Sequence, residues 1–251
     1  MRQIQTRNLR LYGAKGFLLL ETGVGKLNAA AATGALLQLQ PDVSAVVNIG
    51  IAGGLHDYGE VITSHHVRDQ SIGLQWFPHL PSGPVFRQFT SSAICTVDAP
   101  VTHYSADTLW DMECSGIFSA ACQYLSSAQV HSVKVISDNP DNNIQAINKR
   151  RVLELMKNAV PGITQLLTGL TEHINQMAPE HLDALELWVS KAVAQTHHSV
   201  NDELQLRQLL RRYVAITSHL PELPTDSPSS KWIRQSLQQK VSDAPFTYGT
   251  H

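Results

Sequence analysis

The stretch from Val43 to Leu55, VSAVVNIGIAGGL, constrains the fold more than any other part of the chain. Its first half is apolar and rich in β-branched residues, which predicts a buried strand. Gly50, Gly53 and Gly54 follow, and glycines let the backbone bend sharply and approach a ligand closely because they carry no Cβ. In open α/β sheets, ligands bind beyond the carboxyl ends of the strands. We therefore expect a ligand-binding turn at residues 50–54, although an ordinary tight turn explains the same glycines equally well.

The rest of the first part of the chain alternates between β-branched runs and stretches with helical periodicity. This alternation predicts one large α/β domain over residues 1–176, in which a mostly parallel or mixed sheet lies between two layers of helices. The expected strands cover residues 17–21, 43–50, 60–68, 91–98 and 131–137, and the expected helices cover about 26–39, 113–126, 144–158 and 161–176.

Residues 177–251 are expected to form a helical C-terminal extension. In this part of the chain apolar residues recur at helical spacing, as in Leu182, Leu185 and Val189. Apolar stripes of this kind need a surface to cover. We therefore expect these helices to pack on the α/β domain rather than to form a separate module that binds nucleic acid.

Composition argues against several classes of partner. A formal net charge of −2 gives no electrostatic attraction to nucleic acid or to an anionic membrane, and the arginines within 207–212 follow the acidic pair Asp202-Glu203. No apolar segment approaches the length of a transmembrane helix. The three cysteines form no C-x-x-C pair, which argues against a zinc site or a disulfide framework and favours the reducing cytoplasm. Adjacent histidines, such as His65 and His66, point apart, so no metal site is expected.

Short motifs in the first part of the chain occur in the same order as those of one protein superfamily. They are a K-x-x-A-A helix start at Lys26–Ala30, an N-I-G-x-A-G-G-L turn at Asn48–Leu55, a D-M-E segment at 111–113 and an I-S-D strand end at 136–138. Together they resemble the nucleoside phosphorylase/nucleosidase superfamily, most closely the hydrolytic branch typified by 5'-methylthioadenosine/S-adenosylhomocysteine nucleosidase. The resemblance covers residues 10–175 and implies a three-layer α/β/α domain.

The resemblance implies that Asp138 is the catalytic acid. Cleavage of the N-glycosidic bond of a purine nucleoside requires a proton at N7 of the leaving base, and a carboxyl group kept protonated by its surroundings can supply it. Ser137 is implied as its helper. The residues alone favour a cap of a following turn or helix.

The resemblance also implies the residues that bind the substrate. Glu113 matches the glutamate that accepts hydrogen bonds from the ribose hydroxyls, although a carboxylate at a helix start also suits the helix dipole. Met112 matches a methionine that packs under the sugar. In the base-binding segment before Val101, Pro100 replaces the usual aromatic residue. The substrate-binding residues implied beside Glu113 are Met112, Asp111, Val101, Ile51, Ala52 and Gly53.

Two departures from the superfamily pattern affect the expected reaction. Phosphorylases carry a basic residue and a serine on the glycine-rich turn, where this chain has Asn48 and Ile51, so a phosphate site is not expected. Hydrolytic members carry a water-activating glutamate in a G-A-M-x-E-E type segment, which we do not find in this sequence. Glu21 is the nearest acidic candidate to replace it.

We therefore predict hydrolysis of the N-glycosidic bond of a purine nucleoside, such as a 5'-substituted adenosine, without a cofactor. A cytoplasmic location follows from the free thiols, and a homodimer is implied by the resemblance. The alternatives are a catalytically weak or inactive relative that binds a purine nucleoside, a phosphorolytic enzyme, and an unrelated α/β domain with a helical interaction module.

Overall fold

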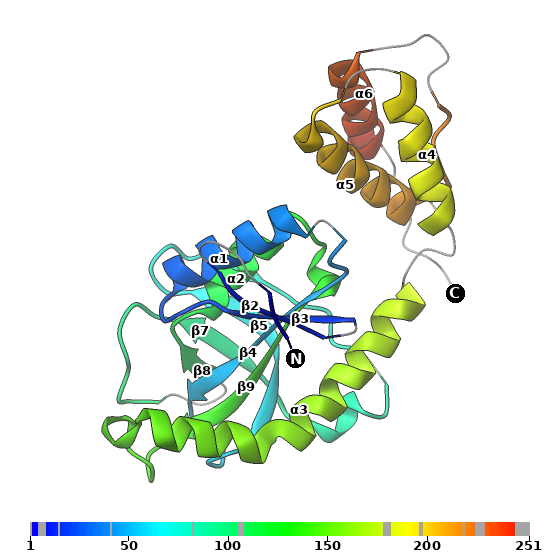
Figure 1. Cartoon of the computed structure of the whole chain (residues 1–251). Coiled ribbons are helices and arrows are strands. Elements are labelled where there is room, and N and C mark those ends of the chain that lie inside the picture. The colour runs from blue at the N-terminus through cyan, green and yellow to red at the C-terminus, as the bar shows by residue number, and fades with distance from the viewer. Residues whose placement is uncertain are drawn as a thin grey trace. The chain divides into compact units, whose positions relative to one another are not determined.

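The computed structural model describes residues 2–4, 9–14, 16–40, 42–81, 83–104, 108–177, 182–195, 198–217, 219–223 and 229–243. The chain divides into two compact units, Met1–Ile174 and Asn175–His251. Each unit is described by itself (Figure 1).

The strands of the first unit form two sheets. In the small antiparallel sheet, β2 lies between β1 and β3, and the bounds are β1 Arg2–Ile4, β2 Arg10–Ala14 and β3 Phe17–Glu21. The larger sheet has the order β6-β5-β7-β8-β4-β9, and a further pairing of β5 with β9 closes it on itself. Its pairings are both parallel and antiparallel, as a mixed sheet requires. Its strands are β4 Val46–Gly53, β5 Val61–Asp69, β6 Gln75–Trp76, β7 Ser91–Thr96, β8 Thr108–Asp111 and β9 Val130–Asp138.

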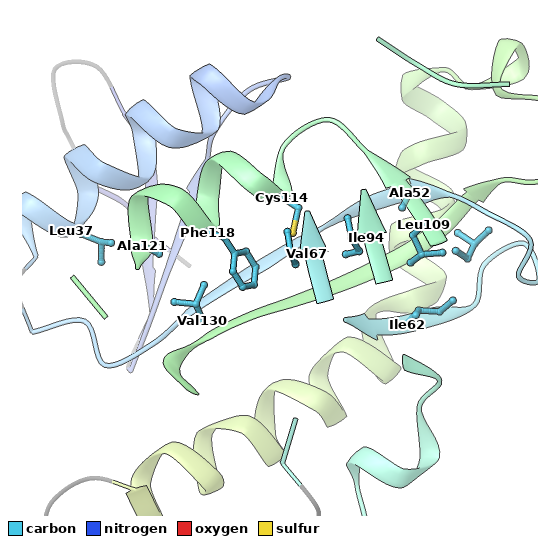
Figure 2. Close-up of a cluster of buried hydrophobic side chains, with 11 residues drawn as sticks. Leu37, Ala52, Ile62, Val67, Ile94, Leu109, Cys114, Phe118, Ala121 and Val130 are labelled. Atoms are coloured by element: carbon cyan, nitrogen blue, oxygen red, sulfur yellow. The ribbon is translucent and has the colours of Figure 1, made fainter. Parts of the chain in front are cut away.

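Helices cover both faces of the larger sheet, which confirms the expected α/β fold (Figure 1). On one face, α1 (Lys26–Leu39) and α2 (Cys114–Ala121) contribute Leu37 and Phe118 to a buried cluster with strand residues such as Ile94 (Figure 2). On the other face, α3 (Lys149–Met177) packs Leu155, Ile163 and Leu166 against Val133 and Val135 of β9. Alternate residues of β9 thus serve opposite layers, as the period of a strand requires. The short 3-10 helices are η1 Phe86–Gln88, η2 Ser127–Gln129 and η3 Ile144–Ala146.

Several of the expected element boundaries are wrong. The helix expected at 113–126 ends at Ala121, the strand expected at 91–98 ends at Thr96, and two larger differences concern β4 and α3. The strand expected at 43–50 begins at Val46 and continues to Gly53, so most of the expected turn at 50–54 is strand, paired with β9, and the bend comes at Gly54. The two helices expected at 144–158 and 161–176 are one helix that runs through Pro161. A proline in a helix interior costs roughly 3 kcal/mol. Here a continuous buried stripe on both sides of Pro161 compensates for that cost.

The second unit contains three described helices with a core of their own. They are α4 Leu182–Gln195, α5 Val200–Thr217 and α6 Ser230–Asp243. The shared core contains Leu185, Trp188, Leu206, Leu210 and Leu237. The apolar stripes thus cover one another, so they do not need the α/β domain as a surface. Packing of these helices on that domain stays a prediction.

Two of the basic residues of this unit form ion pairs with acidic ones. Arg207 forms ion pairs with Glu186 at 3.1 Å and Glu203 at 2.8 Å, and Arg234 pairs with Asp202 at 2.9 Å. Across both units, none of the helices that the structure describes is long and apolar enough to cross a membrane.

Candidate active site

A cavity of about 640 Å³ lies where β4, β8 and β9 end. This volume falls in the range typical of small-molecule sites. Residues 22–24 after β3 and the start of α3 complete its wall. Apart from Glu21, every residue for which a catalytic or binding role was predicted lines this cavity: Asp138, Ser137, Glu113, Met112, Asp111, Val101, Ile51, Ala52 and Gly53.

Ser137 and Asp138 both line the cavity because β9 contains a bulge near its end. Ile136 pairs with Ala52, whereas the next pair of the parallel ladder joins Asp138 to Gly53, so Ser137 is the extra residue. A bulge bends the strand and redirects its side chains. Adjacent residues of a regular strand would point to opposite faces. The bulge therefore explains how two consecutive polar side chains reach one site.

The carboxylate of Asp138 is buried and accepts hydrogen bonds from two hydroxyl groups. Ser137 Oγ donates to Oδ1 at 2.5 Å, and the hydroxyl of Tyr104 donates to Oδ2. The following turn is capped by Asn139, whose Oδ1 accepts from the backbone N–H groups of Asp141 at 3.1 Å and Asn142 at 2.9 Å. The capping role considered for Asp138 is thus filled by its neighbour. Tyr104 lies in the connection between β7 and β8, in no motif that sequence reasoning could have used.

Glu113 lies at the junction of β8 and α2 and contacts the start of α1. Its Oε1 accepts a hydrogen bond from the backbone N–H of Gly25 at 2.8 Å, and Gly25 has a φ of 92°, a conformation that favours glycine. The side chain of Glu113 does not cap α2. Instead, Asp111 Oδ2 accepts from the N–H of Cys114 at 2.8 Å. The carboxylate of Glu113 therefore lines the cavity without serving the helix that it precedes.

Asp111 forms a fully buried ion pair with Lys134, 2.7 Å from Nζ to Oδ2. Its other oxygen accepts from Thr96 Oγ1 at 2.7 Å. Burial opposes the charge on Lys134, but the adjacent Asp111 carboxylate outweighs this effect and raises the pKa of the lysine. Lys134 also lines the cavity and was missed by sequence reasoning. The signal available was a single lysine in the middle of an otherwise uncharged strand core.

A second polar network holds the start of α1, next to cavity-lining residues 22–24. Lys26, the first residue of α1, pairs with Asp69 at 3.0 Å and Asp98 at 2.9 Å, and Ser115 donates to Asp69 at 2.6 Å. Burial works against the charged form of Asp69, but the hydrogen bonds from Ser115 and Lys26 outweigh it and lower the pKa of this carboxyl. The network ties the start of α1 to the ends of β5 and β7.

The cavity wall is apolar over much of its area and contains two unpaired donors. Asn48 Nδ2 and Trp110 Nε1 are buried without a hydrogen-bond partner among the described residues. Buried polar groups in native proteins are nearly always bonded, so these two donors are exceptions among the described residues. The apolar part of the wall includes Ile144, Ile147, Val152 and Met156.

Glu21 does not replace the missing water-activating glutamate. Its carboxylate pairs with Arg10 at 3.4 Å, is about half exposed, and is not part of the cavity wall. Within the described part of the wall, the carboxylates are those of Asp111, Glu113 and Asp138. No group of three or more His, Cys, Asp or Glu side chains that could hold a metal ion occurs among the residues that the structure describes.

Comparison with known sequences gives partial matches to nucleosidases. The chain is 38% identical over 82 residues to the 5'-methylthioadenosine/S-adenosylhomocysteine nucleosidase of Bacillus licheniformis, and 39% identical over 71 residues to that of Bacillus pumilus. These matches cover 28% and 27% of this chain and 35% and 30% of the relatives. The chain thus spans about a third of the length of the curated relatives that it matches. No protein-family model matches it.

Solved structures of the same enzymes share the fold. The S-adenosylhomocysteine nucleosidase of Streptococcus pyogenes, in complex with 5-methylthiotubericidin, aligns with a TM-score of 0.56 at 20% identity over 67% of this chain and 87% of that one. The nucleosidase of Colwellia psychrerythraea 34H, in complex with adenine, aligns with a TM-score of 0.52 at 18% identity over 69% and 86%. The resemblance indicated by the motifs is confirmed, and the α/β unit has the nucleoside phosphorylase-like fold.

Proposed function

We propose that this chain binds a 5'-substituted adenosine or a related purine nucleoside in the cavity and hydrolyses its N-glycosidic bond. The observation that carries the proposal is the bulge at Ser137, which brings Ser137 and Asp138 into the same cavity as Glu113. The names of the relatives and the adenine complex of one structural neighbour support the substrate class.

In the proposed reaction, Asp138 acts as the general acid. In its protonated form it donates a proton to N7 of the base while the bond from C1' to N9 breaks and its electron pair stays with the base. Ser137 bonds Oδ1, and Oδ2, which the Tyr104 hydroxyl contacts in this structure, is the oxygen proposed to face the base. General acid catalysis contributes roughly 10²–10⁴-fold to rate.

Glu113 is proposed to hold the ribose. Its Oε1 is bonded to the N–H of Gly25, and the second oxygen is available to accept from ribose hydroxyls. A negative carboxylate near the sugar also stabilises the positive charge that develops on the ring as the bond breaks.

Water is favoured over phosphate as the nucleophile. Lys134 is the one cation among the described residues of the cavity wall, and Asp111 neutralises it at 2.7 Å. Asn48 and Ile51 contribute no charge. A phosphate dianion would therefore enter without a free cation to pair with.

A second candidate function is binding of a purine nucleoside without turnover. Glu21 lies away from the cavity wall, and the carboxylates that line it already have partners in Lys134, Gly25 and Tyr104. Glu113 has a second oxygen, but the proposed reaction uses it to hold the ribose, so no carboxylate of the described wall is left to activate water.

Base release measures both candidates directly. The full chain is incubated with 5'-methylthioadenosine, S-adenosylhomocysteine or inosine, with and without phosphate, and free base is quantified. We expect adenine release that does not depend on phosphate and that falls roughly 10²–10⁴-fold in Asp138→Asn, since an amide cannot supply the proton. Asp141→Asn, an exposed carboxylate nearby, is the matched control. Binding without any base release would favour the second candidate, and phosphate-dependent release would contradict hydrolysis.

We also propose a homodimer in a reducing, cytoplasmic compartment. Exposed apolar side chains of β3 and α1, such as Phe17, Leu19 and Leu27, support an association surface, and three free cysteines support the compartment. Light scattering should give about twice the 27.6 kDa of one chain. A mass of one chain at assay concentration would contradict the dimer.

A further inference from the structure

The hydroxyl of Tyr104 lies at the carboxylate of Asp138, the group proposed to protonate N7 of a purine base. Its hydroxyl donates to Oδ2 of Asp138, while Ser137 Oγ donates to Oδ1 at 2.5 Å. Both oxygens of the proposed acid are therefore bonded to hydroxyl groups of the protein itself. In this arrangement no oxygen is left unbonded to face N7 of a purine.

The ring of Tyr104 packs closely against β4. A Cβ built on Gly53 would lie 2.7 Å from Cε1 of the ring, so the phenol reaches Asp138 across a position where only a hydrogen fits. Val97, Pro100 and Val101, from the same connection between β7 and β8, line the cavity. Tyr104 is not itself among the lining residues, but its hydroxyl reaches Asp138, which lines the cavity.

Ionisation of the phenol does not relieve this contact near neutral pH. Burial, and then the adjacent Asp138 carboxylate, raise the pKa of Tyr104 above its usual range. The phenol therefore remains a hydrogen-bond donor. For a base to reach Oδ2 within hydrogen-bond distance, the side chain of Tyr104 has to move away.

We propose that Tyr104 is a gate residue whose hydroxyl competes with the purine base for Asp138 and thereby sets the affinity of the site for base and nucleoside. This inference rests on the proposed function. It assigns to Tyr104 a specificity-determining role that no motif of the sequence indicates.

The affinity of the full chain for adenine, measured by calorimetry, tests the competition. Tyr104→Phe keeps the ring and removes the competing donor, so we expect adenine to bind roughly five- to tenfold more tightly, the size of effect of one net hydrogen bond. The KM for 5'-methylthioadenosine should fall by a similar factor while kcat is retained. Tyr124→Phe is the matched control, because the Tyr124 hydroxyl bonds Gln38 at an exposed position. Unchanged or weaker adenine binding in Tyr104→Phe would overturn the inference.

A measurement without ligand tests the contact itself. Tetranitromethane nitrates phenolates, and mass spectrometry of peptides identifies the modified residue. Since Asp138 holds Tyr104 protonated, Asp138→Ala should increase nitration of Tyr104 several-fold and leave Tyr124 unchanged. An equal rate of Tyr104 nitration in the wild-type chain and in Asp138→Ala would contradict the contact between Tyr104 and Asp138.

The failure of the inference and that of the proposed function give different results. Base release by the wild-type chain with no affinity difference in Tyr104→Phe would overturn the competition alone. No adenine binding and no base release in either protein would overturn both.

Discussion

Gly53 and Asp138 face each other across β4 and β9, and the carboxylate of Asp138 fills the space where a side chain at position 53 would begin. A Cβ at this position would contact Asp138 Oδ2 closer than any normal contact. The glycine is therefore required by the close approach of the proposed acid. The conformational freedom expected for this glycine-rich segment is not used here, because Gly53 continues a regular strand.

Gly53→Ala should disable the site more than it destabilises the fold. The new methyl group displaces Asp138, Tyr104 or both, and overpacking of this kind costs roughly 1–3 kcal/mol. Because a misplaced acid no longer reaches N7, we expect base release to fall at least about 100-fold. Activity and urea denaturation are measured side by side. Gly34→Ala is the control, since a Cβ there has no neighbour within 4 Å. Full activity in Gly53→Ala would show that Asp138 is not held by this contact.

Lys134→Met should be strongly destabilising. It leaves Asp111 as a buried carboxylate without its cation, and breaking one side of a buried ion pair costs roughly 3–5 kcal/mol. The double variant Lys134→Met with Asp111→Asn should lose less stability than the two single variants lose in sum, because neither charge of the buried pair then remains. Arg10→Met removes an exposed ion pair and should cost less than about 1 kcal/mol. Urea denaturation of all variants tests the prediction. A loss of stability in Lys134→Met as small as in Arg10→Met would contradict it.

His131 should make the fold less stable in mild acid. Burial lowers the pKa of His131 to about 4, with smaller contributions in the same direction from His173 and His79. The folded pKa lies below the ordinary value of 6.5. The contribution of neutral His131 to the free energy of unfolding is therefore complete above pH 6.5 and is lost as the pH falls towards 4. The loss amounts to roughly 3 kcal/mol. Urea denaturation between pH 7.5 and 4 should show it, and His131→Gln should flatten the profile. His65→Gln, at an exposed position, should not.

The fragment 175–251 should fold by itself. The stripes of α4, α5 and α6 form one shared core, in which Leu206 and Leu210 are fully buried. We expect a helical circular dichroism spectrum and a cooperative thermal transition. Leu210→Ala should lower the stability of the fragment by roughly 2–5 kcal/mol. Leu187→Ala, at an exposed position, should have little effect. A fragment without a cooperative transition would restore the expectation that these helices depend on the α/β domain.

Local patterns predicted most of the elements that position the site. The apolar runs before Gly50 and Ser137 predicted β4 and β9, and the alanine-rich segment after Lys26 predicted α1 at its observed bounds. These patterns succeed because burial of one face imposes a period of two or 3.6 on neighbouring residues. The prediction that strand ends gather the polar residues followed from the same α/β architecture.

Other features depend on contacts between distant residues, and the sequence carried no local signal for them. Short and irregular strands such as β8 lack periodicity over a useful length. Pro161 predicted a break, but packing of α3 on β9 overrides that local preference. Glu21 is the acidic residue nearest in sequence to the place expected for a water-activating glutamate, but its side chain pairs with Arg10.

The sequence by itself determined the α/β class, the order of the main elements and nine of the residues that share the cavity, because hydrophobic periodicity and short motifs are local properties. The tertiary structure alone decided that Ser137 bulges, that Lys134 neutralises Asp111 and that Tyr104 reaches Asp138. These relationships join groups from separate strands and loops. Their geometry depends on packing and on the pairing of buried polar groups in a low-dielectric interior, which no single segment encodes.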